Sequence, residues 1–236
     1  MSIAAAGKDA DSILSGPLTA RRTIQEVVYQ RLSYALMTGQ FDPGATLTIS
    51  YLSELFGTSH MPVREALRRL TAENALETTT TGSSRVPLVT RARLDDICEA
   101  RVVVERAAVE RSIGNIDPPL LRALEHALAD HIAAGIEGRI PIMLQKNQEF
   151  HFIIYRASGA TALVQLIEAL WLRFGPFLRM LSDHLEKHGG NKSEYSSHHR
   201  GMIDAIERGD RKALGDHMVE DIRTTQALLQ TLCPEG

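Results

Sequence analysis

The chain has 236 residues, of which 44% are apolar, and its formal net charge is −3. This length exceeds one typical domain and allows two modest hydrophobic cores. Two cysteines are too few for a disulfide framework, and both lie in helical patterns, where inert thiols are expected. No run approaches the roughly 20 apolar residues that a membrane span requires. The composition therefore excludes a disulfide-stapled module and argues against an integral membrane protein.

The charge differs between the two parts of the chain. Residues 1–90 hold 8 Lys and Arg against 8 Asp and Glu, whereas the remainder holds 18 against 21. Because the first part is not strongly basic, any binding to nucleic acid would depend on a few placed arginines and on dimerisation. Residues 1–17 lack the basic start and long apolar core of a signal peptide. We expect a flexible tail over residues 1–19 and a cytoplasmic protein.

The first predicted helix carries an apolar stripe at helical spacing. The stripe consists of Ile24, Val28, Leu32, Ala35 and Leu36. The pattern stops at Gly39, and Asp42-Pro43-Gly44 predicts a turn. A short second helix is predicted over residues 50–56. Gly57 and Thr58 then join it tightly to a third helix, which is the spacing of a helix-turn-helix.

The third helix is the most informative segment. Its apolar stripe consists of Val63, Ala66, Leu67 and Leu70. Arg64 and Arg68 lie four residues apart on a different face. We expect Ser59 to cap the helix by accepting from the Met61 amide, since Pro62 has no N–H to donate. Such a helix suits phosphates and guanine edges in a major groove, although a plain solvated helix explains this segment alone equally well.

Two β-prone segments follow, at residues 76–80 and 85–89, with the turn Thr81-Gly82-Ser83-Ser84 between them. They predict a hairpin with a small polar tip, which is a wing. Three helices and a two-stranded wing make a winged helix-turn-helix domain over residues 20–90.

This predicted domain resembles the DNA-binding domain of the GntR family of bacterial transcription regulators. The runs that carry the resemblance are TGQFDPGATL (38–47), LSELFGTSHMPVREALRRLTAENALE (52–77) and TGSSRV (81–86). The resemblance implies that Arg64 reads a base and that Ser59 is the small hydroxyl residue at the helix start. It also implies that Gly82 is the glycine of a wing tip that enters the minor groove.

Three further residues are candidate DNA contacts by their position in this domain: His60, Arg68 and Arg85. Two departures from the family pattern concern the operator sequence. His60 stands where an arginine is common, and Ser50 stands where many members carry an arginine at the start of the second helix. These differences leave the operator sequence undetermined, but they do not change the predicted DNA-binding role.

The rest of the chain is almost wholly helical. Helices are predicted over 93–113, 118–137, 140–157, 161–187, 192–208 and 210–231. Gly175-Pro176 should kink or split the fourth of these, and a split would give seven helices. The fold class is therefore mainly α, with an all-helical antiparallel bundle over residues 91–236 and any ligand cavity at its centre.

Polar residues in this bundle are candidates for metal binding. Asn147 and His151 lie at i and i+4, so both can point at one central atom. His199 opens the fifth bundle helix, and Asp221 follows 22 residues later in the last one.

The bundle resembles the FCD ligand-binding domain, which accompanies the winged helix in the FadR-type branch of the GntR family. The resemblance covers about residues 91–232. It is carried by RVVVERAAVE (101–110), the Asn-x3-His pair and HRGMIDAIERGDRKAL (199–214).

The resemblance implies a divalent metal, zinc or nickel, held by an aspartate or asparagine and three histidines. Asn147, His151 and His199 fall on three of these positions, and Asp221 stands where the last histidine is usual. A carboxylate is an acceptable zinc ligand, so Asp221 remains chemically sensible there. His217, one turn earlier, is the alternative. Without a metal, the two ligand histidines would be buried polar residues that bind a water or the effector directly.

Arg101 resembles the family's arginine on the first bundle helix, with Glu105 a turn later to orient it. Facing inward, Arg101 would clamp the carboxylate of an effector through two parallel hydrogen bonds. Facing outward, it would form an ordinary surface salt bridge with Glu105. Arg173 and Arg179, which flank Gly175-Pro176, are further candidates for the same contact.

The remaining aromatic residues and histidines are given structural roles. We expect the core to contain Trp171, Phe174 and Phe177. We expect solvated side chains at His126, His131, His184, His188 and His198.

These features predict a homodimeric repressor whose two Arg64 helices enter successive half-sites of a palindrome. A small carboxylate held by Arg101 and the metal would shift the bundle between two arrangements and release the DNA. A metallohydrolase built on His151, His199 and Asp221 is one alternative, but Glu149 is misplaced as its general base. A DNA-binding scaffold that senses no ligand is the other. We therefore predict a regulator and not an enzyme.

Overall fold

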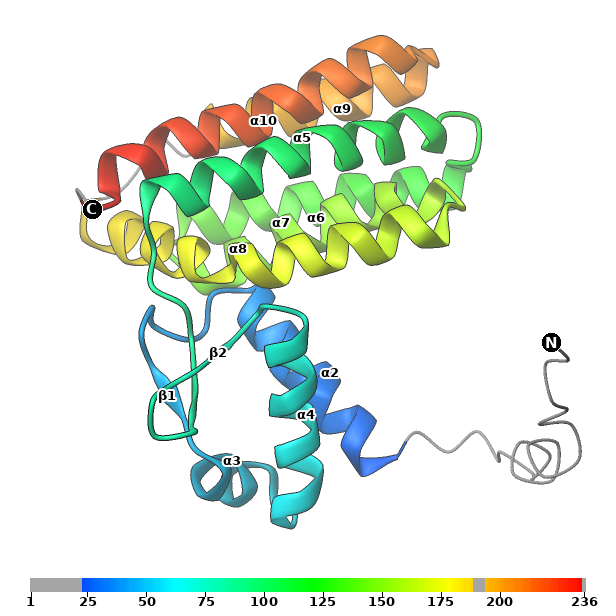
Figure 1. The fold of residues 1–236 in the computed structure, drawn as a ribbon. Helices are drawn as coiled ribbons and strands as arrows, with labels where there is room; N and C mark the ends of the chain where they lie inside the picture. The colour runs from blue at the N-terminus through cyan, green and yellow to red at the C-terminus, as the bar shows by residue number, and fades with distance from the viewer. Residues whose placement is uncertain (1–22, 189–193, 235–236) are drawn as a thin grey trace, which may run out of the picture.

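The computed structural model describes residues 23–188 and 194–234, so the tail expected over residues 1–19 lies outside the described residues. A small domain with a β wing lies against one side of a helical bundle (Figure 1). The winged helix-turn-helix and the all-helical bundle are both confirmed.

The small domain contains three helices and a small sheet. The helices are α2 (Ile24–Met37), α3 (Ile49–Phe56) and α4 (His60–Ala72). Thr23 caps α2 by accepting from the Glu26 amide, and Thr48 caps α3 by accepting from the Tyr51 amide. Gly57 ends α3 in the left-handed conformation, with φ 61°, and this conformation makes the tight turn into α4.

The start of α4 corrects the predicted cap. Ser59 is the N-cap residue, but its side chain makes no capping hydrogen bond with any described residue. Pro62 occupies the third helical position, whose amide commonly donates to such a cap, and proline has no N–H. The predicted hydrogen bond from the Met61 amide to the Ser59 side chain is not formed either. The predicted apolar stripe is buried, at Val63, Ala66, Leu67 and Leu70.

The wing is shorter than predicted and has one more strand. β2 (Glu77–Thr78) and β3 (Ser84–Arg85) form the hairpin, and β1 (Thr46–Leu47) pairs with β3 to give the order β1-β3-β2. Gly82 turns the tip with φ 82°. The sequence pattern missed β1 because two residues are too few to show the alternation typical of a strand.

The described part of the second half forms six helices. They are α5 (Arg91–Ser112), α6 (Pro118–Ile136), α7 (Ile140–Ala157), α8 (Thr161–His188), α9 (Glu194–Arg208) and α10 (Arg211–Leu232). α10 packs on α5 and α9, α6 packs on α7, and α8 packs on α5 and α7. Side-chain caps begin three of them, at Thr90, Asp117 and Asp210. These bounds closely follow the predicted ones.

α8 corrects the prediction of a split at Gly175-Pro176, because the helix continues through both residues. Pro176 removes one backbone hydrogen bond, and burial of Trp171 and Phe177 on either side holds the helix together. By length and composition α8 could cross a membrane. Half of its most apolar window is buried inside the protein, as in the core helix of a bundle.

The two parts of the molecule meet where the end of α2 touches the middle of α8 (Figure 1). Gly175 permits this contact, because a Cβ atom there would overlap the carbonyl oxygen of Leu36. A Cβ atom on Gly39, which has φ 67°, would lie 2.7 Å from the backbone nitrogen of Arg179. Arg179 also pairs with Asp42 at 2.8 Å. The backbones of α2 and α8 are therefore in direct contact, which larger side chains would prevent.

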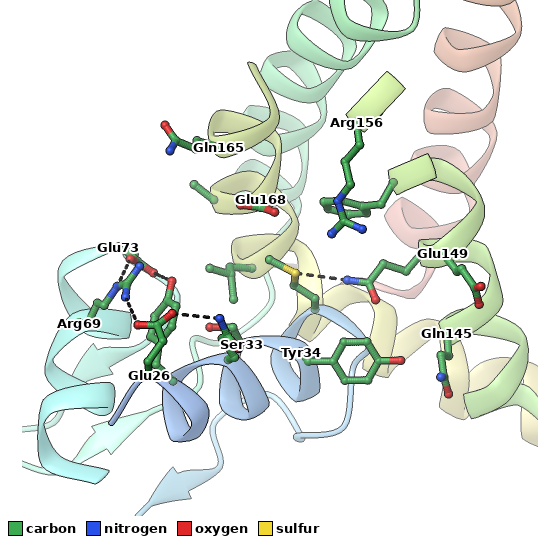
Figure 2. A pocket seen from close by; sticks show the side chains of 17 residues that line it. Glu26, Ser33, Tyr34, Arg69, Glu73, Gln145, Glu149, Arg156, Gln165 and Glu168 are labelled. Atoms are coloured by element: carbon green, nitrogen blue, oxygen red, sulfur yellow. Dashed lines mark hydrogen bonds and ion pairs between the residues drawn. The ribbon is translucent and has the colours of Figure 1, made fainter. Parts of the chain in front are cut away.

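Beside this junction, a cleft of about 820 Å³ separates α2 and α4 from α7 and α8 (Figure 2). The Gln148 amide donates to the sulfur of Met37 at 3.2 Å and joins the two walls. On the small-domain wall, Arg69 lies 3.5 Å over the Tyr29 ring and pairs with Glu73 at 3.0 Å.

Candidate functional sites

The exposed face of α4 carries the candidate residues for base contacts. Ser59, His60 and Arg64 are exposed at its first turns. No acidic side chain among the described residues pairs with Arg64, so its guanidinium donors are available to a ligand. Arg68 follows one turn later, 79% exposed, and pairs with Glu65 at 2.9 Å.

The wing offers less free charge than its sequence suggests. Arg85 donates to Glu77 through Nε at 2.8 Å and Nη2 at 2.6 Å, and the two residues are partners in the sheet register. A phosphate would have to compete with this carboxylate for Arg85. Gly82 is exposed at the tip, next to the paired hydroxyls of Thr79 and Thr81.

The bundle contains a small cavity of about 40 Å³ that is partly open to solvent. The polar side chains that line it are Arg101, His131, Asn147, His151, His199, Asp221 and Thr225. The four residues predicted as metal ligands thus line one cavity, although three different helices supply them.

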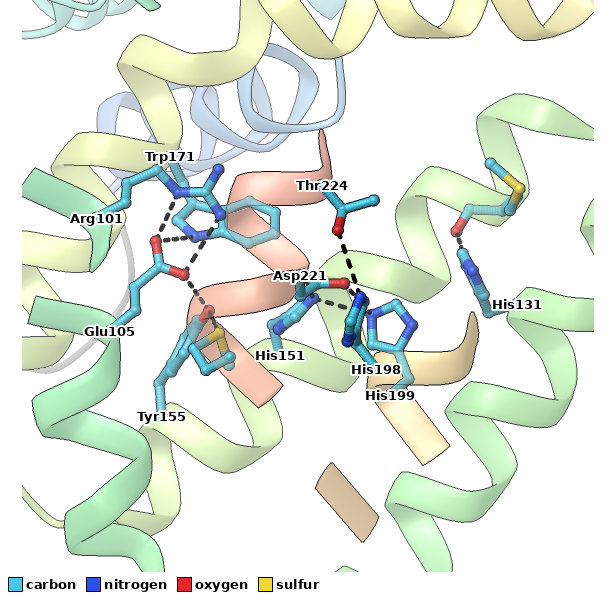
Figure 3. A network of polar contacts seen from close by, with 12 residues as sticks. Arg101, Glu105, His131, His151, Tyr155, Trp171, His198, His199, Asp221 and Thr224 are labelled. Carbon is cyan, nitrogen blue, oxygen red and sulfur yellow. Dashed lines mark hydrogen bonds and ion pairs between the residues drawn. The ribbon is translucent and has the colours of Figure 1, made fainter. Parts of the chain in front are cut away.

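Three of these side chains form a compact donor set (Figure 3). His151 Nε2 lies 3.1 Å from His199 Nε2 and 3.4 Å from an Asp221 carboxylate oxygen. The other Asp221 oxygen lies 3.8 Å from His199 Nε2. Ligand atoms about 2.0–2.2 Å from a tetrahedral zinc ion would be roughly 3.3–3.6 Å apart. The two imidazoles and the carboxylate therefore fit a divalent cation.

The fourth predicted ligand and the alternative ligand differ in position. Asn147, one turn before His151, lines the same cavity. His217 is not part of the compact donor set, and its ring packs against Gly201. This geometry favours Asp221 over His217 as the metal ligand from α10.

The charge of Asp221 is fixed by its neighbours. Burial alone would raise the pKa of this carboxyl, but His199 and His151 outweigh burial and hold its pKa well below the ordinary value. Asp221 is therefore an ionised acceptor. His151 Nδ1 is buried without a hydrogen-bond partner among the described residues, and Nε2 is the atom that faces Asp221. To bind a cation through Nε2, His151 would have to carry its proton on Nδ1.

His131 corrects the expectation of a solvated side chain. It is 4% exposed, its Nδ1 lies 2.9 Å from the Met143 carbonyl, and its ring lies 5.3 Å from the ring of His199. Burial lowers the pKa of His131, against the opposing effect of the Met143 hydrogen bond. The sequence held a usable signal, because His131 continues the buried stripe of Leu124 and Leu128 at helical spacing.

The other histidines vary in exposure. His126 and His188 are exposed, as expected. His184 is half-buried. His198 is also half-buried, and its Nε2 lies 3.3 Å from the Thr224 hydroxyl.

Arg101 faces inward, but its partner is Glu105 (Figure 3). Arg101 Nε donates to one Glu105 oxygen at 2.6 Å and Nη2 donates to the other at 3.3 Å. The two side chains are 5% and 0% exposed, so the expected surface pair is in fact a buried one. Glu105 also accepts from Trp171 Nε1 at 3.1 Å and from the Tyr155 hydroxyl. Sequence reasoning placed Glu105 as a helper and missed that it is the centre of this network.

Two further candidates lie outside the cavity. Arg173 pairs with Asp96 at 3.5 Å, and Arg179 lies at the junction with α2, where it pairs with Asp42. Neither arginine lines the cavity, so the structure does not bring them to the expected effector site. Trp171, Phe174 and Phe177 are buried in the core, as expected.

Comparison with known proteins identifies both halves. The model of the FCD domain matches residues 96–224, and the model described as bacterial regulatory proteins, gntR family, matches residues 24–86. The chain is 30% identical over 198 residues to the HTH-type transcriptional regulator McbR of Escherichia coli, an alignment covering 84% of this chain and 89% of McbR. This chain belongs to the GntR family, in the branch with an FCD domain.

Other relatives and solved structures agree with this assignment. The probable D-xylose utilization operon transcriptional repressor of Paenarthrobacter nicotinovorans is 26% identical, over 84% of both chains. The structure of E. coli McbR/YncC superposes with a TM-score of 0.83 at 29% identity, covering 89% of this chain and 98% of that one. A putative GntR regulator from Rhodococcus sp. RHA1 shares the fold, with a TM-score of 0.71 at 20% identity over 89% of this chain and 99% of that one. The GntR-family chain is therefore a DNA-binding transcriptional regulator.

Proposed function

We propose that this GntR-family protein is a homodimeric repressor that releases a palindromic operator when its bundle binds a small carboxylate together with a divalent metal. The observation that carries this proposal is the donor set of the buried His151 and His199 with the half-buried Asp221. Ionisable groups are costly to bury, and their convergence on one cavity is typical of a binding site. We retain a division into a DNA-binding domain over residues 20–90 and an effector domain over 91–236, and we place the protein in the cytoplasm.

On the DNA side, each subunit would insert the start of α4 into the major groove. Arg64 is exposed and free to donate two parallel hydrogen bonds to a guanine. Two copies related by a two-fold axis would contact half-sites about 34–36 Å apart. His60 and Ser59 would lie at the same end of the helix, and Gly82 would bring the wing close to the minor groove.

On the ligand side, His151, His199 and Asp221 would hold the metal, with Asn147 from the preceding turn of α7. The metal, when bound, supplies a Lewis-acidic position for one carboxylate oxygen. The carboxylate of Asp221 would offset part of the charge of the metal, and each imidazole would bind through its Nε2 lone pair.

α8 would carry the signal between the two sites. Trp171, Phe174 and Leu178 on one side of α8 line the cavity, while Gly175 contacts the carbonyl of Leu36 on α2. A ligand that displaces α8 must therefore displace α2, which packs on α4. The effector shifts this equilibrium only by its differential affinity for the two arrangements.

The test measures thermal stability and operator affinity in the same samples, with an operator selected from random duplexes. Zinc at a hundred times its dissociation constant should stabilise the protein by about 2.7 kcal/mol. Zinc with a small acid should then weaken operator binding. His151→Ala should remove both effects, whereas the control His126→Ala, at an exposed position on α6, should retain them. If no metal or acid changes the melting temperature or the operator affinity, the protein is a DNA-binding scaffold that senses no ligand.

A further inference from the structure

We infer that Met61 is a specificity-determining residue that recognises the C5-methyl group of a thymine in the operator, close to the guanine that Arg64 would contact. The inference rests on the DNA-binding side of the proposed function and adds a second base to each predicted half-site. Three properties of Met61 support it: its position on α4, the charge of its neighbours and the chemistry of its side chain.

Met61 lies on the side of α4 that is opposite the core of the small domain. Successive residues of an α-helix are about 100° apart around its axis. The buried residues Val63, Ala66, Leu67 and Leu70 therefore share one side, and Met61 lies almost directly across the helix from their centre. Its side chain is 59% exposed. Since the first residues of a recognition helix contact base edges, Met61 is at the centre of the face that would enter the major groove.

The neighbours of Met61 on this face differ in the charge that they offer. Arg64 lies on one side of Met61, exposed and without an acidic partner in the part of the chain that the structure describes. Glu65 lies on the other side and accepts from Arg68 Nη2 at 2.9 Å and from Arg68 Nε at 3.2 Å. Because this pair largely cancels its own charge, Arg64 supplies free positive charge beside the apolar surface of Met61.

The chemistry of the methionine side chain selects the base. Methionine has no hydrogen-bond donor and its sulfur is a weak acceptor, so Met61 can read a base edge mainly through apolar contact. The C5-methyl group of thymine is the apolar group that distinguishes a base pair in the major groove. Side chains three residues apart on a helix are about 5–6 Å apart, and successive bases of a strand are about 3.4 Å apart. The thymine should therefore lie within about two base pairs of the guanine.

The experiment uses the full chain and an operator that it selects from random duplexes. Each thymine of the half-sites is replaced in turn by deoxyuridine, which lacks only the C5-methyl group and keeps the same hydrogen-bonding groups. Fluorescence anisotropy at fixed salt measures the affinity. Removing one apolar carbon from the contact should weaken binding about fourfold at one thymine per half-site, and about fifteenfold when both half-sites are substituted.

Three variants identify the residue that contacts this methyl group. Met61→Ala should bind the thymine and deoxyuridine operators equally well. Met61→Leu should retain the difference, because leucine also offers an apolar surface. Leu166→Ala, at a 53% exposed position on α8, is the matched control and should retain the full difference. The melting temperature should not change in either Met61 variant, since this side chain is exposed.

The outcomes separate the inference from the function on which it rests. A selected operator in which no deoxyuridine weakens binding of the wild type would overturn the inference. An equal loss in the wild type and in Met61→Ala would also overturn it, because the methyl group would then act through the shape of the DNA or through another residue. Failure to select any operator would contradict both the inference and the proposed function.

Discussion

The winged domain and the bundle use the same pair of residue types in opposite environments. In the winged domain, Arg69 and Glu73 lie four residues apart, with side chains 50% and 28% exposed. In the bundle, Arg101 and Glu105 have the same spacing, with side chains 5% and 0% exposed. Spacing along a helix decides whether two side chains can meet, and the surrounding elements decide how strongly they interact.

This difference matches the two kinds of ligand. DNA is too large to enter a cavity, so the winged domain must present arginines outward, where a groove can reach them. A small acid can be surrounded completely, so the bundle can place charged groups in a dry interior, where each interaction is stronger. Four experiments test this difference between the two domains.

The largest effect is expected from Arg64→Ala on operator binding. Each bidentate contact to guanine contributes about 1–3 kcal/mol, so a dimer should lose roughly 2–6 kcal/mol of specific binding free energy. The melting temperature should not change, because Arg64 is exposed. Fluorescence anisotropy at fixed salt measures the affinity, with Arg122→Ala on the exposed face of α6 as the control. Unchanged affinity for the operator would show that α4 does not read bases through this arginine.

The next effect is expected from Glu105→Ala on stability. Removing one member of a buried ion pair leaves Arg101 uncompensated and should lower the free energy of unfolding by about 3–5 kcal/mol. Glu65→Ala, which removes the partner of the 79% exposed Arg68, should cost at most about 0.5 kcal/mol. Urea unfolding compares the two variants. Equal losses would mean that burial does not distinguish the two regions.

A smaller effect is expected where the two regions touch. The added methyl group of Gly175→Ala would overlap the Leu36 carbonyl, and overpacking of this kind costs about 1–3 kcal/mol. Operator binding should also lose its response to acid. Gly215→Ala is the matched control, because its methyl group meets the terminal oxygen of Glu110, which can move aside. Thermal unfolding measures the stability of both variants, and anisotropy measures their response to acid. If Gly175→Ala and Gly215→Ala give the same values, α8 does not couple the domains.

The smallest effect concerns reactivity alone. Burial raises the pKa of the Cys98 thiol to about 11, so almost none is ionised at pH 8. In a Cys233→Ser background, Cys98 should react with a disulfide reagent only as fast as the bundle opens. Because Cys98 is the sole cysteine of this variant, the rate reports on the bundle and not on the winged domain. Rapid labelling of the native protein would mean that the bundle interior around Cys98 is open to solvent.

Much of this fold could be predicted from local patterns. The stripe around Val63 and Leu67 indicated which face of α4 is buried, and the spacing of Asn147 and His151 placed both on one face of α7. The polar residues of the cavity are spread over α5 to α10, yet the resemblance to a known family indicated most of them. Only the bundle's geometry distinguished Asp221 from His217.

Other features depended on contacts between elements. Pro176 reads as a helix breaker, but core packing on both sides carries α8 through it. From the sequence, Glu105 either orients Arg101 or forms a surface salt bridge with it, whereas in the structure Arg101, Tyr155 and Trp171 surround it.

Helix starts, apolar faces and the arginines that can lie together depend on residues within one or two turns, so local sequence predicts them. Packing between elements makes one Arg–Glu pair buried and another exposed, and it brings α8 against both the cavity and α2. Burial is a property of all the elements that surround a side chain, and no stretch of local sequence contains that information.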